Sequence, residues 1–195
     1  MPRESPFSDL VVDYMRKSHW SLPRNLTEAD AQVRHIVDGV GMHIDSGAQG
    51  LVAGLWANGV MTKGPCAGHA ALELRPWVDC GVPEPLPGSW GTGESYSAAA
   101  GAANAEGRAR LLELIADFEQ IINDRPGDLV CRPFGPNGAV RLLAQVISAG
   151  DELSIGQASR WYTRKGQQLF AMFSTYLRTR SYESSVSTIV SVPRP

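Results

Sequence analysis

Apolar and polar residues follow a helical period along much of this chain. Stripes of apolar residues at spacings of three and four predict helices over residues 8–18, 27–39, 106–125 and 137–150. Ser8 is a candidate N-cap of the first helix, and Thr27 and Asp30 form a capping-box-like pair at the start of the second. The glycine-rich stretch 46–59 either forms a further helix or allows close packing of its neighbours.

Residues 154–180 contain two helical patterns that are separated by a short polar break. Ser154 and Gln157 have the spacing of a capping box, which predicts the start of a helix. Thr163 and Arg164 form the break, and a broad apolar stripe follows it. A short helix, a tight break and a longer helix are the layout of a helix-turn-helix unit.

The segment 59–107 interrupts the helical pattern because prolines, glycines and small residues dominate it. We predict a long loop here, with one short strand within residues 70–80. Its aromatic residues Trp77, Trp90 and Tyr96 are candidate partner-binding residues, since exposed aromatics often anchor interfaces. The alternative is that they fold back and seal the helical core.

These patterns together predict a mainly α protein, an orthogonal or bundle-like helical domain with a long Gly/Pro-rich loop and short strands. We expect an N-terminal helical part at 1–58, the loop excursion at 59–107 and a C-terminal helical part at 108–195, which carries the helix-turn-helix-like segment 154–180. A length of 195 residues suits one compact unit.

Charge and composition narrow the classes of function. The formal net charge is −2, so nucleic acid or an anionic membrane would have to be bound by a local patch. No window approaches the roughly 18 consecutive apolar residues of a membrane span. The 3 cysteines are widely spaced and the first residues lack a signal-peptide pattern, so we expect a cytoplasmic protein with reduced thiols and no membrane partner.

A local basic patch does occur in the segment 154–180. Four candidate residues would lie at the DNA groove, namely Arg164, Lys165, Gln167 and Gln168. Three more would contact the DNA backbone, namely Arg160, Arg178 and Arg180. Amide side chains can pair with an adenine edge, and cations can contact phosphates. The competing interpretation is an ordinary C-terminal helix pair with a solvated basic face, because the break lacks the glycine of most helix-turn-helix turns.

A second candidate site consists of Cys66, His69 and Cys80, a Cys-x-x-His pair followed by a third sulfur. Zinc takes four nitrogen or sulfur ligands in a tetrahedron, so Cys131 or His43 would have to supply the fourth. Cys66 and His69 also suit a thiol nucleophile with its base. The bland alternative is free core cysteines and a surface histidine.

The remaining sequence adds no catalytic residue. The string His43–Ile44–Asp45–Ser46 brings three catalytic residue types together, but it lacks the Gly-x-Ser-x-Gly elbow. Our leading hypothesis is a small DNA-binding protein of transcription regulation. The alternatives are a protein-interaction adaptor or inhibitor that presents the aromatic loop, and a metal-dependent or thiol-dependent enzyme with zinc as its candidate cofactor; an enzyme is the less expected class.

Overall fold

The computed structural model describes residues 5–37, 42–69, 72, 74–85, 88–90, 93–122, 128–135, 137–145 and 155–190. In α5, side chains are described only for residues 160–181. The helices of this part are α1 (Asp9–Lys17), α2 (Leu26–His35), α3 (Ser46–Ala57), α4 (Gly93–Ile122) and α5 (Ile155–Val190). The strands are β1 (Thr62–Cys66), β2 (Trp77–Cys80), β3 (Leu129–Pro133) and β4 (Val140–Ala144).

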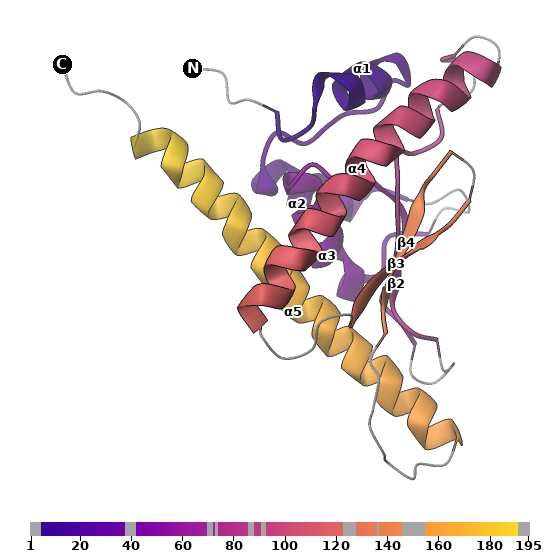
Figure 1. The fold of residues 1–195 in the computed structure, drawn as a ribbon, viewed down its shortest axis with the longest axis vertical. Helices are drawn as coiled ribbons and strands as arrows, with labels where there is room; N and C mark the ends of the chain where they lie inside the picture. The colour runs from indigo at the N-terminus through magenta and orange to yellow at the C-terminus, as the bar shows by residue number, and fades with distance from the viewer. Residues whose placement is uncertain are drawn as a thin grey trace.

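The strands form one antiparallel sheet in the order β1-β2-β4-β3. Thr62 pairs with Cys80 at one end of the β1–β2 ladder, and Cys66 pairs with Trp77 at the other. Figure 1 shows the sheet beside two long helices, α4 and α5, which cross in this view. The predicted mainly α bundle is therefore wrong, because the antiparallel sheet and the helices form the core together.

The strand β4 replaces the helix that we predicted over residues 137–150. Val140, Leu142 and Ala144 are buried, and the two residues between them are not, which is the period of two of a half-covered strand. The helical stripe and the strand pattern share Val140, so periodicity alone did not separate them. Asn137 and Gly138, both at positive φ, form the turn from β3 into β4, and this pair is a strong hairpin signal. Residues 146–150 of the predicted helix lie outside the described residues.

The region 59–107, predicted as a long loop, contains β1, β2 and the first half of α4. The expected strand within residues 70–80 is present as β2. The low-complexity stretch from Gly93 onward is helical because alanine, its commonest residue, has the highest helix propensity. Gly101 and Gly107 lie inside this helix, and no heavy atom lies within 4 Å of the Cβ position of either.

The predicted break at Thr163 and Arg164 is absent, because both residues lie within the continuous helix α5. The segment is therefore no helix-turn-helix. Thr163 is buried and Arg164 is exposed, so the polar pair spans two sides of one helix and does not mark a turn.

The N-terminal helices agree well with the sequence patterns. Ser8 caps α1 by accepting a hydrogen bond from the Val11 amide at 3.4 Å. The predicted capping pair at Thr27 and Asp30 is wrong, because Asn25 caps α2 through the Glu28 amide at 3.0 Å. The stretch 46–59 does form a helix, α3.

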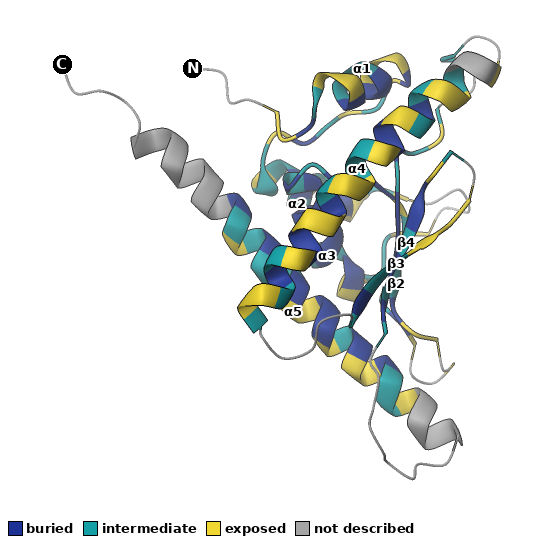
Figure 2. Cartoon of the chain, viewed as in Figure 1, coloured by how far each residue is buried: buried dark blue, intermediate teal, exposed yellow. Residues whose placement is uncertain are grey.

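Two clusters of buried side chains meet at α3 (Figure 2). Leu51 and Leu55 face the sheet together with α4 and α5, whereas Val52 and Trp56 face α1 and α2. α3 is therefore buried on nearly all sides, which places its N-terminus in a fixed position beside β1. None of the helices in the described part of the chain has the length and apolar character that a bilayer crossing requires.

Candidate functional site

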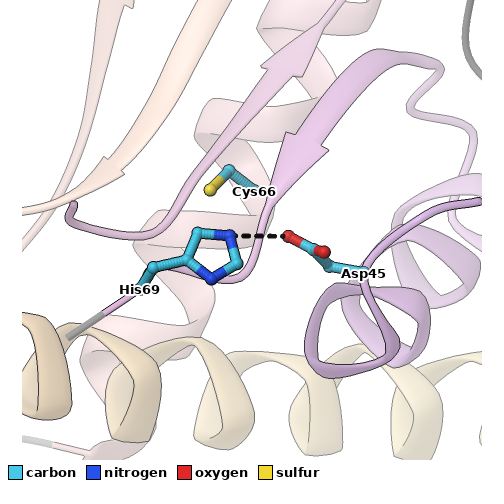
Figure 3. A group of neighbouring side chains, drawn as sticks. All are labelled: Asp45, Cys66 and His69. Carbon is cyan, nitrogen blue, oxygen red and sulfur yellow. Dashed lines mark ion pairs between the residues drawn. The ribbon is translucent and has the colours of Figure 1, made fainter. Parts of the chain in front are cut away.

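Three side chains of different chemistry meet where α3 begins and β1 ends. Asp45, Cys66 and His69 each offer one ligand atom, and these atoms all lie within 4.8 Å of one another. Figure 3 shows the Asp45 carboxylate facing the His69 imidazole, with the Cys66 thiol above the ring in this view. The pair Cys66 and His69 was predicted from the sequence, whereas Asp45 enters in place of Cys80.

Asp45 is the N-cap residue of α3, yet its side chain makes no capping hydrogen bond. Its Oδ2 instead accepts a hydrogen bond from the Ala67 amide at 3.2 Å and lies 3.4 Å from His69 Nε2. An aspartate at this position normally accepts from an amide of its own helix. The carboxylate has therefore exchanged its capping role for contact with the turn that follows β1.

The turn from Cys66 to His69 holds its own ligand atoms in place. The Gly68 amide donates to the Cys66 sulfur at 3.4 Å. Gly68 has φ of +80°, and a Cβ there would lie 2.8 Å from the Pro76 nitrogen. Only glycine suits this positive φ and this close backbone approach, so the short spacing of the Cys-x-x-His pair depends on Gly68.

The helix α5 supports this turn from below (Figure 3). Gln167 Nε2 donates to the carbonyl oxygens of Ala67 at 3.1 Å and Gly68 at 2.9 Å. The preceding residue of α5 also packs closely against this region, because a Cβ on Gly166 would lie 2.9 Å from Pro76 Cγ. Gln167 was predicted to read a DNA groove, and in the folded chain it holds the turn that carries Cys66 and His69.

The site is open to solvent. The side chains of His69 and Asp45 are 47% and 39% exposed, and Cys66 is half-buried. Figure 3 shows that Nε2 of His69 faces Asp45, while the second ring nitrogen points away from both partners. His69 and Asp45 are therefore the two members of the cluster that a small molecule or ion can reach from solvent.

The other cysteines lie elsewhere and have a different chemistry. Cys80 is at the far end of the β1–β2 ladder from Cys66, and its burial raises the pKa of its thiol well above the usual value. Burial also raises the pKa of Cys131 to about 11. His43, the other candidate ligand, forms a backbone bridge with Val37 and is not in the cluster. The predicted third and fourth ligands are therefore not assembled with Cys66 and His69.

Apart from Gln167, the predicted DNA-binding residues divide into two groups. Arg178 forms a two-bond ion pair with Asp30, at 2.7 and 3.0 Å, and Arg180 pairs with Asp117. These two arginines tie α5 to α2 and α4, so the fold uses them internally. The other group remains on the surface of α5 and consists of Arg160, Arg164, Lys165 and Gln168.

The predicted partner-binding aromatics make contacts within the chain. Trp90 and Tyr96 pack against Tyr14, with ring centroids 5.4 and 6.3 Å from it, and Trp90 Nε1 donates to the Ser18 hydroxyl. Trp77 lies on β2, and Cζ of the Arg141 guanidinium stands 4.1 Å from the centroid of the Trp77 ring. All three side chains are half-buried, and Trp90 and Tyr96 pack against the buried cluster of α1 and α3, as expected if they seal the core.

No family model, curated protein or solved structure matches this chain. Its function must therefore be argued from the residues themselves.

Proposed function

We propose that the protein binds a zinc-like divalent metal ion through Asp45, Cys66 and His69. The observation that carries the proposal is the convergence of one oxygen, one sulfur and one nitrogen ligand atom within 4.8 Å. Zinc is bound in proteins by these donor types. Three protein ligands with an exposed fourth position are the pattern of catalytic zinc sites, in which water completes the tetrahedron.

One donor separation, that between His69 and Asp45, fits a shared ion. The 3.4 Å between His69 Nε2 and Asp45 Oδ2 is longer than a good charge-assisted hydrogen bond. Two ligand atoms at about 2.0–2.1 Å from a tetrahedral ion lie about 3.3 Å apart. The pair therefore already has the separation that an ion between them requires.

A thiol nucleophile with a catalytic histidine fits the geometry less well. In such a triad one ring nitrogen faces the nucleophile and the other faces the carboxylate. Here Nε2 faces Asp45 and the opposite nitrogen points away from Cys66 (Figure 3). Both the metal site and the thiol nucleophile need Cys66 in its reduced form. A cytoplasmic location, which the sequence predicts, would keep this thiol reduced.

An ion at this position would activate a water molecule for hydrolysis. Zinc lowers the pKa of bound water to about 7 and so supplies hydroxide near neutral pH. Gly68 would assist by donating its amide hydrogen to the Cys66 thiolate. We therefore propose that the metal ion serves a hydrolytic reaction. A purely structural zinc ion would have four protein ligands, whereas this site offers three.

The test is titration of the metal-free full chain with zinc, followed by Co²⁺ substitution. We expect about one ion per chain and a thiolate-to-cobalt absorption band. Cys66→Ser should abolish the band and Asp45→Asn should weaken binding, whereas Cys131→Ser should bind like the wild type. A wild type without stoichiometric zinc would overturn the proposal, and rapid alkylation of Cys66 in that protein would favour the thiol nucleophile.

The second candidate function is binding to the DNA backbone through the exposed part of α5. Arg160, Arg164 and Gln168 recur every four residues and therefore line one side of the helix, with Lys165 beside them. Since Gln167 is bonded to the turn, groove reading is the weaker part of the original hypothesis. Contacts from these cations to phosphates do not need a helix-turn-helix. Its test is the salt dependence of binding to duplex DNA.

A further inference from the structure

We infer that one face of the sheet binds single-stranded nucleic acid by stacking unpaired bases on Trp77 and Phe134. This outward face, as we call it, also carries Arg132 and Arg141. The inference does not depend on the proposed metal site, because it uses none of the three metal-site residues. It rests on the placement of the rings, on their access to solvent and on the charge around them.

The two faces of the sheet have different surroundings. Val78 of β2 and Leu142 of β4 are fully buried in the core that the sheet forms with α3, α4 and α5. Successive side chains of a strand point to opposite faces, so Trp77 and Arg141 point away from that core. The register pairs Arg141 with Arg132 of β3, and paired residues share a face. These three side chains therefore lie together on the outward face.

A guanidinium contacts two aromatic rings on the outward face. Cζ of Arg141 stands 4.1 Å from the centroid of the Trp77 ring and 3.8 Å from the centroid of the Phe134 ring. Two hydrogen bonds to the Asp79 carboxylate, at 2.6 and 2.9 Å, fix the guanidinium in this position. The rings are thus held by a group that is itself held, which keeps the entropy cost of binding a ligand low.

Solvent reaches this group of side chains. Phe134, the residue after β3, is 38% exposed, and Trp77 is half-buried. Val130 and Leu143, which pair with each other on the same face beside Trp77, are also half-buried. Accessible aromatic rings on an antiparallel sheet can stack unpaired bases, and the bases of a duplex are already stacked on one another. The outward face therefore suits a single strand better than a duplex.

The charge of the outward face favours a polyanion. Arg132 is exposed, and its Nη2 donates to the neutral amide oxygen of Gln145 at 2.9 Å, a bond that leaves the positive charge available for a phosphate. The one carboxylate in the described strands belongs to Asp79, which is buried and bonded to Arg141. Rings for bases and cations for phosphates are the combination with which proteins bind single strands.

The test measures the fluorescence anisotropy of a labelled, mixed-sequence single-stranded DNA octamer with the full chain, in about 50 mM salt with a chelator present. A second probe is the same octamer without bases, which keeps the phosphates but has no rings to stack. We expect the complete strand to bind and the abasic strand to bind about fivefold or more weakly. A duplex of the same sequence should also bind more weakly than the single strand.

Four variants separate stacking from general attraction. Phe134→Leu removes the ring but keeps an apolar side chain, and should raise Kd for the complete strand about fivefold or more. Phe134→Tyr keeps a ring and should bind like the wild type. Arg132→Gln should weaken binding and lower its salt dependence by about one counterion. Leu112→Ala, at an exposed position of α4, is the control and should change nothing.

Equal binding of the complete and the abasic strand would overturn the inference, because phosphate attraction alone would then explain the affinity. Equal binding by Phe134→Leu and the wild type, or tighter binding of the duplex, would overturn it as well. Absence of binding would also do so, and a dimer that dissociates in Phe134→Leu would then identify a second copy of the chain as the occupant. None of these outcomes bears on the metal site, which zinc titration tests separately.

Discussion

At the scale of single residues, Gln167 is the side chain that connects α5 with the metal-site turn. Replacement of Gln167 by Leu keeps a similar volume but removes both hydrogen bonds to the carbonyls of Ala67 and Gly68. Groups that orient ligands in this way typically contribute about 10–100-fold to metal affinity. We expect the zinc affinity of Gln167→Leu to fall by about that factor in a calorimetric titration.

The matched control is Gln168→Leu, the same change at the next position of α5, where the side chain is exposed. Its zinc affinity should equal that of the wild type. If both variants bind zinc equally well, Gln167 only closes the gap between helix and turn and does not position the ligands.

The composition of the site shows what residue patterns can and cannot predict. Cys66 and His69 were found because ligands at a spacing of three share one turn, a relation that is local in sequence. Asp45 was seen only as part of a sequence string, since its approach to the turn depends on how α3 packs against β1. Cys80 was included because its residue type was right, although strand pairing places it at the opposite end of the ladder.

At the scale of elements, the contact between α5 and the sheet depends on Gly166. A Cβ at this position would lie 2.9 Å from Pro76 Cγ and 3.2 Å from Ala144 Cβ. Alanine would gain about 1 kcal/mol of helix propensity, but the proline ring and the strand cannot easily move aside. We expect Gly166→Ala to lower the free energy of unfolding by about 1–2 kcal/mol, measured by urea denaturation.

Gly107→Ala in α4 is the corresponding control, because nothing lies within 4 Å of the Cβ position there. This change should raise the free energy of unfolding by about 0.5–1 kcal/mol. A similar gain from Gly166→Ala would contradict the close packing of α5 against Pro76 and Ala144.

Two of the mispredictions, at β4 and in α5, have different physical causes. Val140, Leu142 and Ala144 suit a strand, and Val140, Leu143, Val146 and Ile147 suit a helix, so the apolar residues of this segment satisfy both periods. Pairing with β2, which includes the partly buried ion pair of Arg141 and Asp79 at 2.6 Å, decides for the strand. In α5 the polar pair at residues 163 and 164 looked like a break, although the helix is continuous through both residues.

At the scale of the whole molecule, binding to DNA would have to overcome an unfavourable overall charge. The formal net charge is −2, so attraction to phosphates must come from a local patch, for which Arg160, Arg164 and Lys165 are the candidates on α5. Three phosphate contacts release about three counterions, which predicts that affinity for duplex DNA falls about 40-fold between 50 and 200 mM salt. Fluorescence anisotropy with a mixed-sequence duplex at both salt concentrations measures this change directly.

The comparison that assigns such binding to α5 uses two variants of equal charge. One carries glutamine at positions 160, 164 and 165, and the other carries it at Arg16, Lys17 and Arg34, which are exposed on α1 and α2. We expect the first variant to lose binding and the second to retain it, because a local patch acts within roughly one Debye length of about 8–10 Å. Equal losses in both would mean that general charge governs binding, and salt-independent binding would exclude phosphate contacts as its source.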